Sequence, residues 1–339
     1  MRLKNLLTSV AMIGGMMTGT AMAGTVTFKE IAKIPLPCQP GHGDWVSYDP
    51  GNQSVYISMH GGGMAVVDTT TNTVSHVFND IPEPNTMTFD DNYIYETAAE
   101  GPGAGKVNQI VVIDKNTWQV VDRVNTVGTS PDGMFIDKAN HRLYAVMDDD
   151  NSIDEYTTGA HPQYIKKIML MPKNPVDGPD VANLYHGWIY ATDDSYVEKI
   201  DPNTGAIANI VNYHLKLTDL GGTKGTIYDS IHNSIWVGTT TGGVLIINPD
   251  TLAVEKHLKE TAGADAVRAD DGLGLVYVFE GGIPGFDYYS LADEKYLGTV
   301  KTGAKKPTHS GAVDPVTHRI FAYAGGDAEL DVFQPVVQQ

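Results

Sequence analysis

Short apolar runs alternate with short polar turns from Thr25 to the end of the chain. The runs are rich in β-branched and aromatic residues, as in "VYIS", "IYAT" and "VYVF", and Asp, Asn, Pro and Gly bound them. Such residues favour strands, while the bounding residues accept the backbone angles that tight turns need. No segment of comparable length shows a sustained helical period. The pattern therefore predicts an all-β protein built from antiparallel hairpins.

The hairpins belong to a repeat of about 44 residues, a period typical of propeller blades. Each copy has a turn, an alternating stretch that ends in Asp, a polar turn and an apolar run, as in "GHGDWVSYDPGNQSVYISMHGG" from Gly41. A further strand follows, closed by turns such as "VVDTTTNTV" and "IDPNTGAI". Seven copies can be aligned, of which the fourth, from Gly178, is irregular. Each copy supplies three or four short strands, which is one propeller blade.

The two ends of the chain predict how the ring closes. The last repeat stops at "ELDVFQPVVQQ", without the outer strand of the other copies, while "TVTFKEIAKIPLP" from Thr25 reads as an outer strand without a blade. Pairing the two would complete the last blade and cover both strand edges, which otherwise promote aggregation. We expect one seven-bladed β-propeller domain over residues 24–339, closed by its N-terminal strand.

Residues 1–23 have the features of a cleaved signal peptide. Arg2 and Lys4 begin the chain, a short apolar stretch follows, and "AMA" at 21–23 offers small residues for cleavage. No later window is apolar over the roughly 20 residues that a membrane-spanning helix needs. We expect a periplasmic protein with no membrane span.

The turn and strand motifs resemble those of a known family. The "VVDTTTNTV" and "IDPNTGAI" turns after "VYIS" or "IYAT" strands are similar to the YVTN-repeat, YncE-like propellers of exported bacterial proteins. The resemblance covers the chain after the signal sequence and implies the same fold. It implies no single activity, because this fold hosts binding proteins, lactonases, lyases and redox enzymes.

Charge and cysteine content narrow the partners. The net charge of −18 repels nucleic-acid backbones and anionic lipids, so we expect no nucleic-acid partner. Cys38 is the single cysteine, which excludes an internal disulfide. The core must therefore supply the stability of the fold.

Candidate chemistry lies where the chain turns into the innermost strand of each blade, because these turns meet at the mouth of the central channel. Counting back from the Asp that closes this strand aligns Asp44, Asn85, Asp132, Lys224, Asp265 and His309, with Asp177 or Gly178 in the fourth repeat. The turn between the second and third strands opens on the same face, and it adds His60, Glu100, Asp148, Asp149, Asp193, Asp194, Thr239, Thr240 and Glu280.

Two interpretations of this set compete at each position. Asp and Asn are common in turns because they bond to their own backbone, which suffices for Asp132 in "SPDG". It does not explain Lys224, His309 or His60, since neither Lys nor His is a preferred turn residue. Our first hypothesis is a channel mouth that binds a small ligand through Asp44, Asn85, Asp132 and Asp265, or a divalent metal ion through His42, His60 and His309. Zinc or copper suits imidazole ligands, and calcium suits them less well.

Two other functions stay open. An enzyme of the lactonase, hydrolase or lyase type would use Lys224 to hold an anionic substrate and His42 or His309 as its base, because histidine titrates near neutral pH. A scaffold would instead bind another periplasmic protein through its acidic rim. His141, His232 and His318 fall in turns away from the mouth and are predicted to be solvated surface residues.

Overall fold

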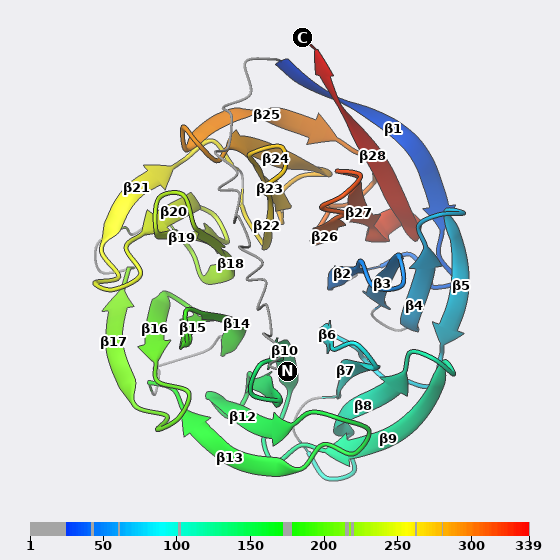
Figure 1. The fold of residues 1–339 in the computed structure, drawn as a ribbon, viewed down its shortest axis with the longest axis vertical. Coiled ribbons are helices and arrows are strands. Elements are labelled where there is room, and N and C mark those ends of the chain that lie inside the picture. Colours follow the sequence, from blue (N-terminus) through cyan, green and yellow to red (C-terminus); the bar gives the residue numbers. More distant parts are fainter. Residues whose placement is uncertain are drawn as a thin grey trace, which may run out of the picture.

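The protein is a ring of seven antiparallel sheets around a central axis (Figure 1). The computed structural model of the chain describes residues 25–41, 44–59, 62–100, 103–171, 178–213, 217, 220–261, 263–279 and 281–338. The predicted signal peptide at 1–23 lies outside these residues. Each sheet has four strands, and we number the sheets as blades 1 to 7 in chain order.

Blades 1 to 3 each run from an inner strand to an outer strand. Blade 1 consists of β2 (Val46–Asp49), β3 (Ser54–Met59), β4 (Gly63–Asp68) and β5 (Thr73–Phe78). Blade 2 consists of β6 (Met87–Phe89), β7 (Tyr93–Ala99), β8 (Asn108–Asp114) and β9 (Gln119–Asn125). Blade 3 consists of β10 (Pro131–Asp137), β11 (Arg142–Met147), β12 (Ser152–Thr157) and β13 (Tyr164–Met169).

Blades 4 to 6 repeat this order. Blade 4 consists of β14 (Pro179–Tyr185), β15 (Trp188–Asp193), β16 (Tyr196–Ile200) and β17 (Ile207–Asn212). Blade 5 consists of β18 (Thr223–Asp229), β19 (Ser234–Thr239), β20 (Gly243–Ile247) and β21 (Val254–Leu258). Blade 6 consists of β22 (Ala266–Asp270), β23 (Leu275–Phe279), β24 (Gly285–Ser290) and β25 (Lys295–Lys301).

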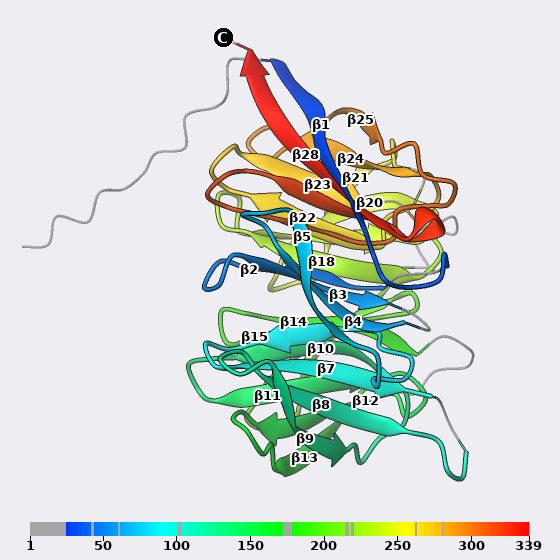
Figure 2. The ribbon, with the colours of Figure 1, turned by 90° about the vertical axis from the view of Figure 1, so that its right-hand side faces the viewer.

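Blade 7 joins the two ends of the chain, which confirms the predicted ring closure. It consists of β26 (Gly311–Val313), β27 (Ile320–Ala324), β28 (Glu329–Gln338) and the N-terminal β1 (Thr25–Pro35), with the short 3-10 helix η1 (Gly325–Asp327) before β28. β1 pairs antiparallel with β28 along its length, from Thr25 opposite Gln338 to Pro35 opposite Glu329. Figure 2 shows the two strands running together along one side of the ring.

The Asp that closes the innermost strand recurs because it holds the turn that follows. Asp49 Oδ1 accepts the backbone N–H of Gly51 at 2.8 Å, and Asp314 Oδ1 accepts that of Val316 at 2.9 Å. Such bonds between a side chain and its own turn favour a tight hairpin over a continued strand. The repeat is thus visible in the sequence because its turns need this residue.

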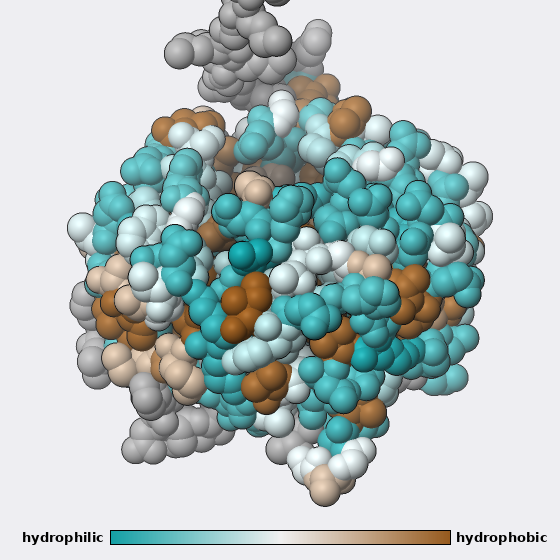
Figure 3. All heavy atoms as spheres, turned by 60° about the horizontal axis from the view of Figure 1, so that its bottom comes forward, coloured by the Kyte–Doolittle hydropathy of each residue, from teal (hydrophilic) through white to brown (hydrophobic). Residues whose placement is uncertain are grey.

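The core lies between neighbouring blades. Tyr56 and Val66 of blade 1, for example, pack with Met87 and Ile94 of blade 2, and all four are buried. Polar residues cover much of the face seen in Figure 3. In the described part of the chain, no helix is long and apolar enough to cross a membrane.

Candidate functional site

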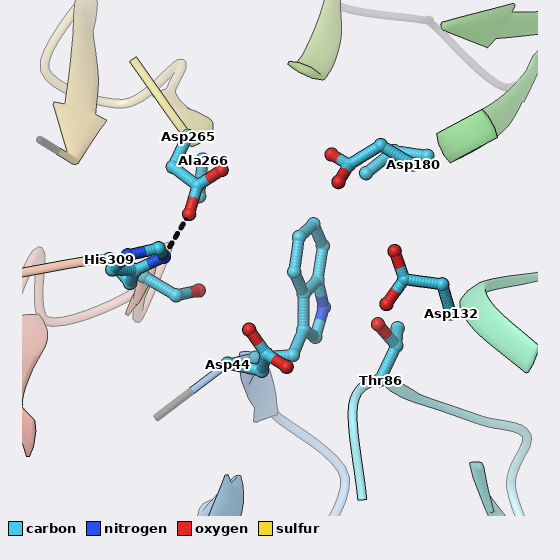
Figure 4. A pocket seen from close by; sticks show the side chains of 10 residues that line it. Asp44, Thr86, Asp132, Asp180, Asp265, Ala266 and His309 are labelled. Atoms are coloured by element: carbon cyan, nitrogen blue, oxygen red, sulfur yellow. Dashed lines mark ion pairs between the residues drawn. The ribbon is translucent and has the colours of Figure 1, made fainter. Parts of the chain in front are cut away.

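One polar side chain from most blades reaches a common space at the channel mouth. Figure 4 shows Asp44, Thr86, Asp132, Asp180, Asp265 and His309 around it. The cavity that they enclose has a volume of about 30 Å³, room for water molecules or a bare ion. Its lining residues are Asp44, Trp45, Thr86, Asp132, Asp180, Val181, Asp265, Ala266, His309 and Ser310. We call Asp44, Thr86, Asp132, Asp180, Lys224, Asp265 and His309 the mouth ring.

Irregular strand pairing positions three members of the mouth ring. The ladder register shifts between Pro131 and Met134 in blade 3, between Pro179 and Val181 in blade 4, and between Thr223 and Thr226 in blade 5. Asp132, Asp180 and Lys224 lie within these shifts. Bulges of this kind redirect side chains and are common beside functional sites.

The prediction for blade 4 was wrong. The ring residue is Asp180, whereas Gly178 precedes β14 and Asp177 lies outside the described residues. Counting back from a closing Asp failed here because Tyr185 ends this innermost strand instead. The Pro-Asp pair shared by blades 3 and 4 was the signal that could have found it.

The structure describes only some of the other predicted residues. In blade 2 the cavity is lined by Thr86, the neighbour of the predicted Asn85. Glu100 accepts the backbone N–H of Val107 at 2.8 Å and so holds its own hairpin loop. His42, His60 and Glu280 lie outside the described residues.

Lys224 and Asp180 form an ion pair on one side of the mouth ring. Lys224 Nζ lies 2.8 Å from Asp180 Oδ1. Burial, with Asp265 and Asp44 nearby, raises the pKa of Asp180 to about 6, although Lys224 opposes the shift. Burial lowers the pKa of Lys224, but Asp180, Asp265 and Asp132 outweigh burial and raise it overall. Lys224 is therefore a fixed positive charge.

His309 and Asp265 form a second ion pair across the blade 6–blade 7 boundary, from Nδ1 to Oδ2. Burial lowers the pKa of His309, but the hydrogen bond and charge of Asp265, together with Asp44, raise it overall. His309 thus favours its protonated form more than an ordinary histidine does.

Asp132 is a second carboxyl group of the mouth ring with a raised pKa. Burial raises its pKa well above the ordinary value, and the charges of Asp180, Asp44 and Asp148 raise it further, while Lys224 opposes them. Asp132 consequently retains a proton to a higher pH than an ordinary aspartate. A nearby positive charge would release that proton.

A buried layer behind the mouth ring was missed at the sequence level. Glu96 on β7 is fully buried, and both its carboxylate oxygens accept from Ser58 Oγ, at 2.9 and 3.1 Å. Burial raises the pKa of Glu96 to about 8, and the charge of Asp44 contributes. Its signal was an acid inside the apolar strand "YIYETAA".

Arg268 on β22 was also missed. Its guanidinium lies over the Trp45 ring, 4.4 Å from the ring centre, in a cation–π contact. Burial lowers the pKa of Arg268 to about 10. The Trp45 face beside the cavity is therefore already occupied by a positive group.

The predicted metal site cannot be built from the described residues alone. No group of three ligand atoms within 4.8 Å of one another occurs around His309 in the part of the chain that the structure describes. Zinc or copper binding at the mouth therefore stays a prediction that depends on His42 and His60.

The chain matches no protein-family model and no curated protein in the comparisons made. The propeller fold by itself hosts many activities. The function must therefore be inferred from the chemistry of the mouth ring.

Proposed function

We propose that the protein binds a small cation, or the cationic group of a small molecule, at the mouth of the central channel. One observation carries the proposal: the carboxyl groups of Asp44, Asp132, Asp180 and Asp265 converge on one small cavity. Lys224 forms an ion pair with Asp180, and His309 forms one with Asp265. Perturbed carboxyl groups gathered in a cavity are typical of functional sites.

Repulsion among the carboxyl groups of the mouth ring adds to this support. Asp180, Asp44 and Asp148 repel the ionised form of Asp132 and raise its pKa. A cation in the cavity would offset this repulsion and let Asp132 ionise. Binding should therefore release a proton and strengthen as the pH rises.

The size of the cavity limits the ligand. About 30 Å³ holds a bare ion or one or two water molecules, so a larger ligand would place only its charged end there. Among metal ions, zinc and copper remain candidates if His42 and His60 contribute ligands, while oxygen ligands alone would suit calcium or manganese.

Isothermal titration calorimetry at pH 8 with calcium, manganese, zinc, copper(II) and methylammonium tests the proposal. Asp44→Asn and Asp132→Asn keep the side-chain shape and remove the charge, and each should weaken binding by roughly tenfold or more, the equivalent of about 1.4 kcal/mol. Asp271→Asn, an exposed residue beyond the far end of β22, is the matched control. Absence of binding to the parent, or unchanged binding by both ring variants, would contradict the proposal.

A second candidate is acid–base catalysis, which the His309–Asp265 pair favours. A carboxylate that orients an imidazole is a common part of catalytic sites. Because the pKa of His309 is raised, it suits a general acid better than the base suggested by sequence. Hydrolysis of a lactone panel by the parent and not by His309→Gln or Lys224→Met would support this alternative; no turnover by the parent would remove it.

We also propose export to the periplasm and membership of the YVTN-repeat propellers. The support is the sequence of residues 1–23 and the seven blades with their Asp-closed turns. N-terminal sequencing of the protein recovered from a periplasmic fraction should begin near Gly24; an N-terminus that retains Met1 would contradict export by cleavage.

A further inference from the structure

A second cluster of possible metal ligands lies on the face of the ring opposite the mouth. Asp229 ends β18, His232 lies in the turn to β19, and Glu294 lies in the turn between β24 and β25 of the next blade. Both turns follow a strand that runs away from the mouth, so they share the far face. The cluster therefore links blades 5 and 6.

The ligand atoms of this cluster are close together. His232 Nδ1 lies 2.7 Å from Asp229 Oδ2 and 3.8 Å from Glu294 Oε1. One ligand atom from each of the three side chains lies within 4.8 Å of the others. One imidazole and two carboxylates form a ligand set that divalent transition metals accept.

The surroundings orient these ligand atoms. Asp229 has a fully buried side chain, and its Oδ1 accepts the backbone N–H groups of Ile231 and His232 at 2.8 and 3.2 Å. Its Oδ2 is thereby aimed at the imidazole.

Access and charge also suit an ion. The side chains of His232 and Glu294 are 33% and 20% exposed, so an ion and its water ligands can enter from solvent. Lys256 Nζ lies 3.6 Å from Glu294 Oε2, the oxygen other than the one nearest His232. Lys256 therefore fixes Glu294 while leaving Oε1 toward the cluster.

We propose that Asp229, His232 and Glu294 bind a divalent transition-metal ion, with zinc the best match, as a clamp between blades 5 and 6. The ion would replace the proton shared by His232 and Asp229 and draw Glu294 Oε1 inward. The site is separate from the mouth ring and does not depend on the function proposed there.

The chain contains a natural comparison for this site. His318 Nδ1 lies 2.9 and 3.0 Å from the two oxygens of Asp270, whose side chain is also buried, between blades 7 and 6. Among the described residues, no third ligand joins this pair in a metal-binding group. The His318–Asp270 site has the same kind of pair as the clamp but no third ligand among the described residues, so we expect that it does not bind the metal.

Zinc titration in an Asp44→Asn/Asp132→Asn/His309→Gln background tests the clamp separately from the mouth ring, because it removes carboxylate and imidazole ligands there. This background variant should bind one zinc ion and gain thermal stability. Adding Glu294→Gln should weaken zinc binding by at least about tenfold, the loss typical of even an outer-shell partner, and remove the stability gain. Adding His318→Gln should change neither.

Thermal melting in the presence of a chelator shows whether a variant has lost a metal ligand or has misfolded. Glu294→Gln should melt within a few degrees of its parent without metal, because Glu294 is partly exposed. If the background variant binds no zinc, or if adding Glu294→Gln and adding His232→Gln both leave its zinc binding unchanged, the clamp is wrong. Neither result tests cation binding at the mouth, because that binding is measured separately by titrating the parent and the mouth-ring variants.

Discussion

At the scale of single residues, the channel mouth is defined by carboxyl groups that resist ionisation. Glu96, Asp132 and Asp180 all have raised pKa values, and burial is the largest cause in each. In each, the cost of burying the charge outweighs the favourable contacts that the ionised form makes. Carboxyl groups with raised pKa values lower the stability of the folded protein near neutral pH, and they are common at binding and catalytic sites.

Glu96 should make the protein less stable in alkaline solution. Its folded pKa is raised to about 8 from an ordinary value of 4.5, so its contribution is fully present below the ordinary pKa and is lost as the pH rises through the folded pKa. Glu96→Gln should therefore gain stability over the parent, by a few kcal/mol at pH 9, because each tenfold change in an ionisation constant corresponds to about 1.4 kcal/mol.

Urea unfolding at pH 5, 7 and 9 measures this effect. Asp180 and Asp331, with pKa values of about 6, add a slope of the same sign at lower pH, and Asp132 also has a raised pKa. The difference in slope between the parent and Glu96→Gln from pH 7 to 9 therefore isolates Glu96. Equal slopes for the parent and Glu96→Gln across that interval would refute the assignment.

At the scale of strands, close contact between innermost strands holds the mouth ring together. Gly225 follows Lys224, and its N–H donates to the carbonyl of Asp265 at 2.9 Å. A Cβ at Gly225 would lie 2.6 Å from that oxygen and 3.2 Å from Ala266 Cα. The neighbouring backbone can approach only because no side chain intervenes.

Gly225→Ala should consequently destabilise the fold and disturb the ring. We expect a loss of roughly 1–3 kcal/mol in the free energy of unfolding, the usual cost of overpacking, with weaker cation binding. Gly281→Ala is the matched control, since a Cβ there meets no atom within 4 Å. Chemical unfolding of the two variants would refute the account if their losses were equal.

At the scale of the whole molecule, β1 closes the ring and belongs to its core. Ile34 is 3% exposed and packs among residues of blades 1 and 7, whereas Ile31 on the same strand is 42% exposed. Closure covers the edge of β28, which would otherwise be open to pairing with another chain.

Truncation of these two isoleucines tests how much the closing strand contributes. Ile34→Ala should lower the free energy of unfolding by roughly 2–4 kcal/mol, because it leaves a cavity in the core. Ile31→Ala should cost under about 1 kcal/mol, as is usual at the surface. Comparable losses in guanidinium unfolding would mean that β1 does not pack as described.

The fold was readable from the sequence because its turns carry their own signature. Asp49 and Asp314 mark hairpins through local hydrogen bonds, so the repeat, the blade number and the ring closure followed. The residues of the mouth ring could be predicted only in the blades whose innermost strand ends in this Asp. Tyr185 replaced the closing Asp in blade 4, so Asp180 was missed.

Contacts between blades could not be read in the same way. Glu96 faces Ser58 of the preceding blade, and the far-face cluster joins His232 to Glu294 of the next blade. His232 was predicted to be a simple surface residue because its partner lies far along the chain. Packing between repeats, which local patterns do not encode, brings these groups together.

The central claim is cation binding coupled to the carboxyl groups of the mouth ring. Its most direct test is calorimetric titration of the parent and of Asp44→Asn/Asp132→Asn at pH 6 and pH 8, in buffers of different ionisation enthalpy. We predict tighter binding at pH 8 and proton release on binding for the parent, and the loss of the mouth site in the double variant. Equal affinities at the two pH values, no released proton, or the same binding isotherm for both proteins would contradict the claim.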